Sequence, residues 1–141
     1  MIQLTKIFHF EMAHAIHGYD GACKNIHGHS YELHVTLAHT EQKDGYIPSP
    51  GFDLDFKEIK KVVKDTVIDM LDHKVVLSQA FLLKNPSSIS PENLFTWKVE
   101  PTAENLLIYI AQELSKNLPA ETSLCRLKLF ETKDSYAEWS K

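Results

Sequence analysis

The chain has 141 residues, of which 43% are hydrophobic and 24% are charged, and these values are typical of one soluble globular domain. Its formal net charge is −4, from 15 Lys and Arg against 19 Asp and Glu. A protein that binds nucleic acid through the phosphate backbone is usually basic, so this charge argues against nucleic acid as a partner. We therefore predict a single domain over residues 1–141 that does not bind nucleic acid.

Membrane contact and secretion are not expected either. No apolar run reaches the roughly 18 residues of a membrane span, and the N-terminus MIQLTKIFHF lacks the charged and apolar regions of a signal peptide. The two cysteines, Cys23 and Cys125, lie far apart in the sequence, which is typical of free thiols in a reducing compartment. The expected location is the cytoplasm.

The first two predicted elements are strands. Apolar and polar residues alternate from Ile2 to His14 and again from His27 to Leu37, with the period of two of a strand that has one buried face. Residues 15–26 between them contain two glycines and are predicted to form a loop. Turns are expected after the second strand, at Lys43-Asp44-Gly45 and at Pro48-Ser49-Pro50-Gly51.

Two helices are predicted in the middle of the chain. Asp55 followed by Glu58 fits a capping box, which places the start of the first helix near Phe56. Its apolar stripe at helical spacing comprises Ile59, Val62, Val63, Val67, Met70 and Leu71. Thr102 is expected to cap a second helix that ends before Pro119, and the prolines within 78–98 favour a loop between the two helices.

The last part of the chain predicts a hairpin. Alternation returns over 123–131, and 136–139 is expected to pair with it across a turn at Lys133-Asp134. The inward face of the strand over 123–131 would carry Cys125, Leu127 and Leu129. A short extended piece over 94–99 is the remaining candidate element. The order β-β-α-α-β-β indicates an α+β fold, in which an antiparallel four-stranded sheet carries two helices on one face.

Three of the eight histidines fall on positions that face the predicted core. His27 and His29 are two residues apart in the second strand, so both side chains point the same way as the apolar Tyr31. His14 is two residues after Met12 in the first strand and so points to the same inward face. Three imidazoles that face a partly dry pocket are the ligand set of a catalytic zinc, which keeps a fourth position for water or substrate. The alternative is that these histidines are unrelated and are either buried or on the surface.

Other polar residues leave more than one role open. Cys23 precedes His27 by four residues and could complete a closed zinc site, act as a nucleophile or base, or simply be buried. Asp72 and His73 follow the first helix and fit either a proton-transfer pair or an ordinary helix C-terminus. Glu131 alternates with Leu127 and Leu129 and so is predicted to point inward, where a buried carboxylate needs a partner such as the guanidine-like edge of a ligand. The alternative is that the strand end emerges into solvent.

These residues occur within short motifs that follow one another between about Phe10 and Thr132. In order, they are Phe10-x-x-Ala13-His14, Cys23-x-x-x-His27-Gly28-His29-Ser30-Tyr31, Leu71-Asp72-His73, Pro101-Thr102-x-Glu104-Asn105 and Phe130-Glu131-Thr132. Their joint occurrence resembles the 6-pyruvoyl-tetrahydropterin synthase / 6-carboxytetrahydropterin synthase family. The resemblance implies the tunnelling fold (T-fold), a homohexamer of two trimers, and active sites built at subunit interfaces.

The resemblance also implies a role for each candidate residue. The implied ligands of Zn²⁺ are His14, His27 and His29. Proton transfer at the substrate side chain would use the thiolate of Cys23 together with Asp72 and His73 from another subunit. Binding of the pterin would use Glu131 at its amino-pyrimidine edge, with Thr102 and Glu104 forming part of the pocket.

The product is the remaining question, because both main branches of the family act on 7,8-dihydroneopterin triphosphate. One branch eliminates triphosphate to give a 6-pyruvoyl product. The other also cleaves the side chain, which gives 6-carboxy-5,6,7,8-tetrahydropterin and acetaldehyde on the route to queuosine. The short spacing from Cys23 to His27 resembles the bacterial carboxy branch and favours that product, although 74–100 is longer than in compact members. The alternatives are the pyruvoyl lyase, a zinc- and pterin-binding module without chemistry, and a metal-free pterin aldolase.

Overall fold

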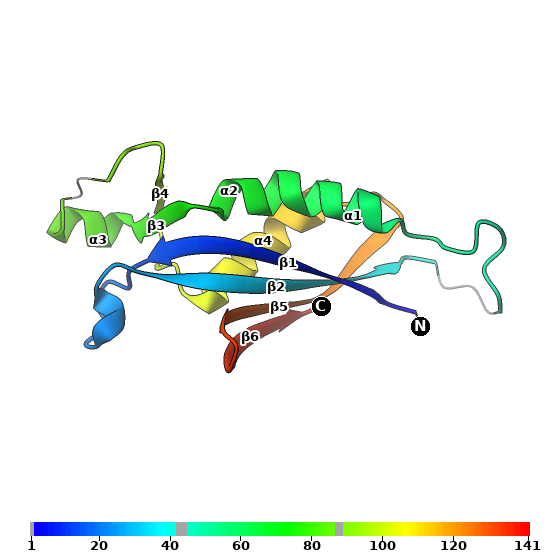
Figure 1. Ribbon diagram of the computed structural model, residues 1–141, viewed down its shortest axis with the longest axis horizontal. Coiled ribbons are helices and arrows are strands. Elements are labelled where there is room, and N and C mark those ends of the chain that lie inside the picture. The colour runs from blue at the N-terminus through cyan, green and yellow to red at the C-terminus, as the bar shows by residue number, and fades with distance from the viewer. Residues whose placement is uncertain (1, 42–44, 87–88) are drawn as a thin grey trace.

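The computed structural model describes residues 2–41, 45–86 and 89–141, and the predicted turn at Lys43-Asp44-Gly45 therefore lies mostly outside it. A twisted sheet carries its main helices on one face (Figure 1). The elements are β1 (Leu4–His14), η1 (Ala22–Lys24), β2 (His27–His39), α1 (Phe56–Val63), η2 (Lys64–Ile68), α2 (Asp69–Leu71), β3 (Lys74–Ser78), α3 (Gln79–Lys84), β4 (Leu94–Trp97), α4 (Ala103–Asn117), β5 (Thr122–Thr132) and β6 (Ser135–Ser140). No helix among the described residues is long and apolar enough to cross a membrane.

The sheet contains the four predicted strands and two more. Its order is β4-β3-β1-β2-β5-β6, with β1, β2, β5 and β6 antiparallel as predicted. The prediction of a four-stranded, wholly antiparallel sheet is wrong, because β3 and β4 extend it as parallel strands beside β1. The short apolar run of β3 follows α2 almost directly, and periodicity alone cannot assign such a run to a strand or a helix. The extended piece predicted at 94–99 is β4.

The first helix begins at the residue predicted from the sequence and then changes from α-helical to π-helical geometry. The carboxylate of Asp55 accepts a hydrogen bond from the backbone N–H of Lys57 at 2.8 Å and so caps α1. The chain continues through a π-helical segment, η2, into α2. A π-turn holds more residues than an α-turn and rotates the positions that follow. Met70 is therefore 44% exposed rather than part of the apolar stripe, whereas Leu71 is fully buried.

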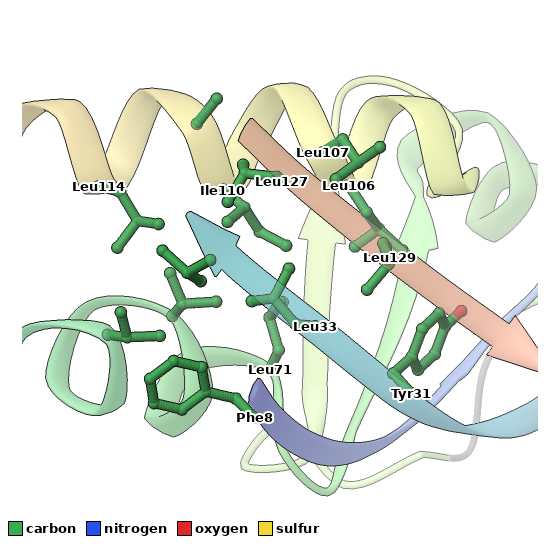
Figure 2. Close-up of a cluster of buried hydrophobic side chains, with 14 of the residues drawn as sticks. Phe8, Tyr31, Leu33, Leu71, Leu106, Leu107, Ile110, Leu114, Leu127 and Leu129 are labelled. Atoms are coloured by element: carbon green, nitrogen blue, oxygen red, sulfur yellow. The ribbon is translucent and has the colours of Figure 1, made fainter. Parts of the chain in front are cut away.

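The hydrophobic core lies between the inward face of the sheet and the helices. Thr102 caps α4 by accepting a hydrogen bond from the N–H of Asn105 at 3.2 Å, and the helix ends before Pro119 as predicted. The buried face of α4 carries Leu106, Leu107, Ile110, Ala111 and Leu114. These side chains meet Leu33 of β2 and its neighbours on β1 and β5 (Figure 2).

One residue that was predicted to face the core does not. The pairing of β2 with β5 shifts by one residue, since Thr36 is opposite Arg126 and Leu37 is opposite Leu124. Cys125 is the extra residue of this β-bulge and is only partly buried, while Leu124 is 4% exposed. A bulge of one residue reverses which side chains face inward, which a regular alternation cannot anticipate.

Truncation of Leu33 tests the position of the core. Leu33 is fully buried, so we expect Leu33→Ala to lower the free energy of unfolding by about 2–5 kcal/mol. Leu83→Ala is the matched control, because Leu83 is 84% exposed and its loss should change stability by less than about 0.5 kcal/mol. Urea denaturation at one fixed protein concentration measures both. Equal effects of the two substitutions would contradict this placement of the core.

Candidate metal centre and adjoining cavity

The three histidines on inward parity come together at one end of β1 and β2. His14 is the direct cross-strand partner of His27, and His29 pairs with Met12 on the same side. The ring centroids lie 4.6 Å apart for His14 and His27, 5.2 Å for His14 and His29, and 5.0 Å for His27 and His29. One nitrogen from each ring lies within 4.8 Å of the others, so the three side chains could hold one metal ion.

Backbone carbonyls orient two of these rings. Nδ1 of His14 is 2.7 Å from the carbonyl oxygen of Pro101, and Nδ1 of His27 is 2.8 Å from that of Asn25. A carbonyl only accepts, so each Nδ1 carries the proton and donates it, which leaves Nε2 as a free lone pair. This hydrogen bond from the second ring nitrogen to a carbonyl is the usual support of a metal-bound histidine.

The third ring presents a nitrogen without a partner. Nε2 of His29 is buried and makes no hydrogen bond within the described part of the chain, and the closest charged atom is Oε2 of Glu131 at 3.9 Å. A buried nitrogen without a hydrogen-bond partner destabilises the folded protein unless another group binds it. A metal ion shared with His14 and His27 would supply that partner, so the donor set fits a bound metal.

The electrostatics of the cluster favour the neutral imidazoles that metals require. Burial lowers the pKa of His14 below its ordinary value, and the neighbouring His27 and His29 lower it further, against the hydrogen bond to Pro101 and the charge of Glu131. Burial also lowers the pKa of His29, again opposed by Glu131. Both rings are therefore neutral near pH 7, and a neutral ring has a lone pair to donate.

A cavity of about 450 Å³ adjoins the histidines. Five of the residues that the sequence singles out line it, namely His14, Cys23, Thr102, Glu104 and Glu131. Cys23 lies in η1 and is exposed, and its sulfur is not part of the group of ligand atoms within 4.8 Å. The three-histidine set thus keeps an open coordination position, as a catalytic rather than a closed structural site does.

Glu131 lies at a backbone irregularity. In the β5–β6 hairpin, Phe130 pairs with Tyr136 and Thr132 pairs with Ser135, so Glu131 is the extra residue of a β-bulge. Here the carboxylate is only partly exposed and points to the cavity, beside His29.

Asp72 and His73 lie elsewhere in the same chain. The backbone N–H of Glu11 donates to Oδ1 of Asp72 at 2.9 Å, and Nδ1 of His73 is 3.0 Å from the same oxygen. His73 is 78% exposed and lines a second hollow with Glu11 and Ser30, whose side chains face away from the core. A single chain therefore orients this pair but does not bring it to the cavity with Cys23.

The cavity also contains two tyrosines, Tyr19 and Tyr136, that the sequence reasoning does not identify. Tyr19 lies in the loop between β1 and β2, where no periodicity assigns a direction to a side chain. Its position between two glycines and four residues before Cys23 is the only signal that could have indicated it. Tyr136 follows the β5–β6 turn and pairs with Phe130, next to the bulge at Glu131.

The geometry describes a cavity of small-molecule size beside three histidines that could hold a metal ion, and comparisons with known proteins identify the family. The family model for 6-pyruvoyl tetrahydropterin synthase matches residues 3–141, so the chain belongs to this family. The 6-carboxy-5,6,7,8-tetrahydropterin synthase of Haemophilus influenzae is 31% identical, over 99% of each chain. A dihydroneopterin monophosphate aldolase of Pyrococcus furiosus is 33% identical, over 86% of this chain and 82% of that protein.

Solved structures support the fold. The 6-pyruvoyl tetrahydropterin synthase of Caenorhabditis elegans superimposes with a TM-score of 0.70 at 22% sequence identity, over 99% of this chain and 95% of that one. The predicted family and the T-fold are therefore confirmed, although the sheet has two more strands than predicted. The chain is an enzyme of the tetrahydropterin synthase family.

Removal of one imidazole tests the metal centre. We expect His27→Ala to lose the metal, from about one ion per chain in the unaltered protein, because two histidines bind far more weakly than three. His9→Ala is the matched control, since the His9 side chain is 70% exposed and faces away from the cluster. Elemental analysis of the purified, dialysed proteins measures both. Unaltered metal content in His27→Ala would contradict the three-histidine site.

Proposed function

We propose that this enzyme is a zinc-dependent lyase that converts 7,8-dihydroneopterin triphosphate to 6-carboxy-5,6,7,8-tetrahydropterin, acetaldehyde and triphosphate, a step of queuosine biosynthesis. The observation that carries the proposal is the cavity that Cys23 and Glu131 share with His14, one of the three converging histidines. The relative from Haemophilus influenzae, named for the 6-carboxy product and aligned over 99% of both chains, favours this branch of the family.

The polar residues of the cavity have complementary roles in binding the pterin. The carboxylate of Glu131 accepts two parallel N–H donors from the amino-pyrimidine edge of the ring, which is a strong, charge-assisted contact. Thr102 and Glu104, at the N-terminus of α4, form the neighbouring wall. Together they place the substrate side chain toward the histidines.

The chemistry requires removal and return of protons on the substrate side chain. Zn²⁺ held by His14, His27 and His29 would polarise the side-chain oxygens and so make the adjacent C–H more acidic. The Cys23 thiolate accepts a proton from carbon and donates it back at the next position. Asp72 orients His73, and this pair carries the proton onward.

The relay pair reaches the cavity only if a second subunit supplies it. Within one chain His73, which Asp72 orients, lines a different hollow from Cys23, and this supports active sites shared between subunits of a homo-oligomer, in the family's arrangement a hexamer of two trimers. The described residues that line the cavity also include no Lys or Arg. The triphosphate group therefore extends out of the cavity, toward solvent or the neighbouring subunit.

The test is anaerobic incubation with 7,8-dihydroneopterin triphosphate, followed by chromatography and mass spectrometry of the products. We expect 6-carboxy-5,6,7,8-tetrahydropterin together with acetaldehyde. A 6-pyruvoyl product would move the enzyme to the pyruvoyl branch, and binding without any product would indicate a pterin-binding module.

An aldolase is the second candidate, because the relative from Pyrococcus furiosus is named as one. An aldolase cleaves a carbon–carbon bond and, on this alternative, needs no metal. Turnover of dihydroneopterin monophosphate that survives complete removal of metal by a chelator would favour it. Loss of activity on chelation and recovery with Zn²⁺ would favour the lyase.

Substitution of the thiol separates catalysis from metal binding. We expect Cys23→Ala to lower kcat by roughly 10²- to 10⁴-fold, the usual contribution of a general acid–base group, while its metal content stays unaltered. Cys125→Ala is the matched control, because Cys125 lies at the bulge of β5 and not in the cavity. If Cys23→Ala loses the metal, Cys23 is a ligand and this assignment is wrong.

A further inference from the structure

The two tyrosines of the cavity differ in what already covers their rings. The ring of Tyr136 lies 4.6 Å from that of Phe130, centroid to centroid, and Nζ of Lys128 lies 5.0 Å from its centroid. Tyr19 makes no such ring contact within the described ranges, and it is 56% exposed. An aromatic ring at the wall of a cavity, with no ring or cation on it, is available to a ligand.

The ring of Tyr19 lies close to the backbone of Gly21. A Cβ atom on Gly21 would lie 2.5 Å from Cε1 and 3.1 Å from Cζ of Tyr19, so a side chain at this position would displace the ring. The φ angle of Gly21 is −174°, an extended conformation that any residue adopts. The backbone therefore does not require glycine here, and the tyrosine ring explains the residue.

The loop that carries Tyr19 is anchored at two points. The N–H of Ile16 donates to the carbonyl of Cys23 at 2.8 Å and closes the base of the loop. The N–H of His17 donates to Oε1 of Glu100 at 2.6 Å and ties the loop to the segment before α4. Tyr19 is thus held beside the cavity before any ligand arrives, which lowers the entropy lost on binding.

We infer that Tyr19 is a substrate-binding residue whose ring forms an aromatic wall for the bicyclic ring of the substrate, and that Gly21 keeps this wall in place. The inference rests on the proposed function, because it takes a flat heteroaromatic ring as the ligand. Stacking on an aromatic side chain recognises the face of such a ring. Glu131, in the same cavity, recognises its polar edge, so the two residues select for different properties of one ligand.

The experiment measures the Kd of neopterin, a fluorescent pterin without phosphate groups, for the zinc-loaded protein and a set of variants. We expect Tyr19→Ala to weaken binding roughly 5- to 100-fold, the usual loss when a stacked ring is removed. Tyr19→Phe keeps the ring and stays within about twofold. Tyr46→Ala is the matched control, because Tyr46 is fully exposed in the loop between β2 and α1 and its loss leaves the Kd unaltered.

The role of Gly21 is tested by a double-mutant cycle. Gly21→Ala weakens binding because its methyl group displaces the ring of Tyr19. In the Tyr19→Ala background the same substitution has no further effect, since no ring remains to be displaced. Equal effects of Gly21→Ala in both backgrounds would show that Gly21 acts without Tyr19.

The remaining outcomes distinguish this inference from the proposed function. The zinc content of Tyr19→Ala stays at the level of the unaltered protein, because the candidate metal ligands are His14, His27 and His29. Unaltered affinity in Tyr19→Ala overturns the inference and leaves the proposed function intact. Loss of zinc together with affinity also overturns it, since the loop would then act through the metal centre. If the unaltered protein binds no neopterin, the proposed function fails and the inference fails with it.

Discussion

The register between β1 and β2 is the constraint on which the site depends. It places His14 opposite His27 and Phe10 opposite Tyr31, so the same pairing builds the three-histidine cluster and part of the hydrophobic core. The rings of Phe10 and Tyr31 stack with centroids 4.9 Å apart. A slip of one residue would turn the apolar side chains of one strand to solvent together with its histidines. The hydrophobic core therefore fixes the geometry of the three histidines.

A three-residue segment before α4 connects that register to the rest of the site. Glu100 accepts a hydrogen bond from the loop that carries Cys23, Pro101 accepts one from His14, and Thr102 caps the helix. The N-terminus of α4, the loop that carries Cys23 and one histidine of the cluster are thus held by adjacent residues. This arrangement explains why the cavity forms between elements that are distant in sequence.

The backbone is strained at His73, a residue of the proposed proton-transfer pair. His73 has a φ angle of +60°, which is uncommon for a residue with a side chain. The backbone of Glu11 holds this conformation, since its N–H donates to Asp72 and its carbonyl accepts from the N–H of His73 at 2.6 Å. Strained conformations persist where the surrounding structure enforces them and often mark functional positions. An exposed, oriented imidazole at this point suits a group that acts on another subunit.

The local residue pattern determined the four antiparallel strands, both predicted helix N-caps and the inward direction of His14, His27 and His29, whereas the register between β1 and β2 brings these histidines together. The pattern succeeded because regular strands place side chains two apart on one face, whatever the rest of the chain does. Only the tertiary structure decided the parallel strands β3 and β4, the bulges at Cys125 and Glu131, and the position of the Tyr19 side chain at the cavity. These features depend on hydrogen bonds and contacts between distant segments, and a bulge or an irregular loop breaks the period from which a direction could be predicted.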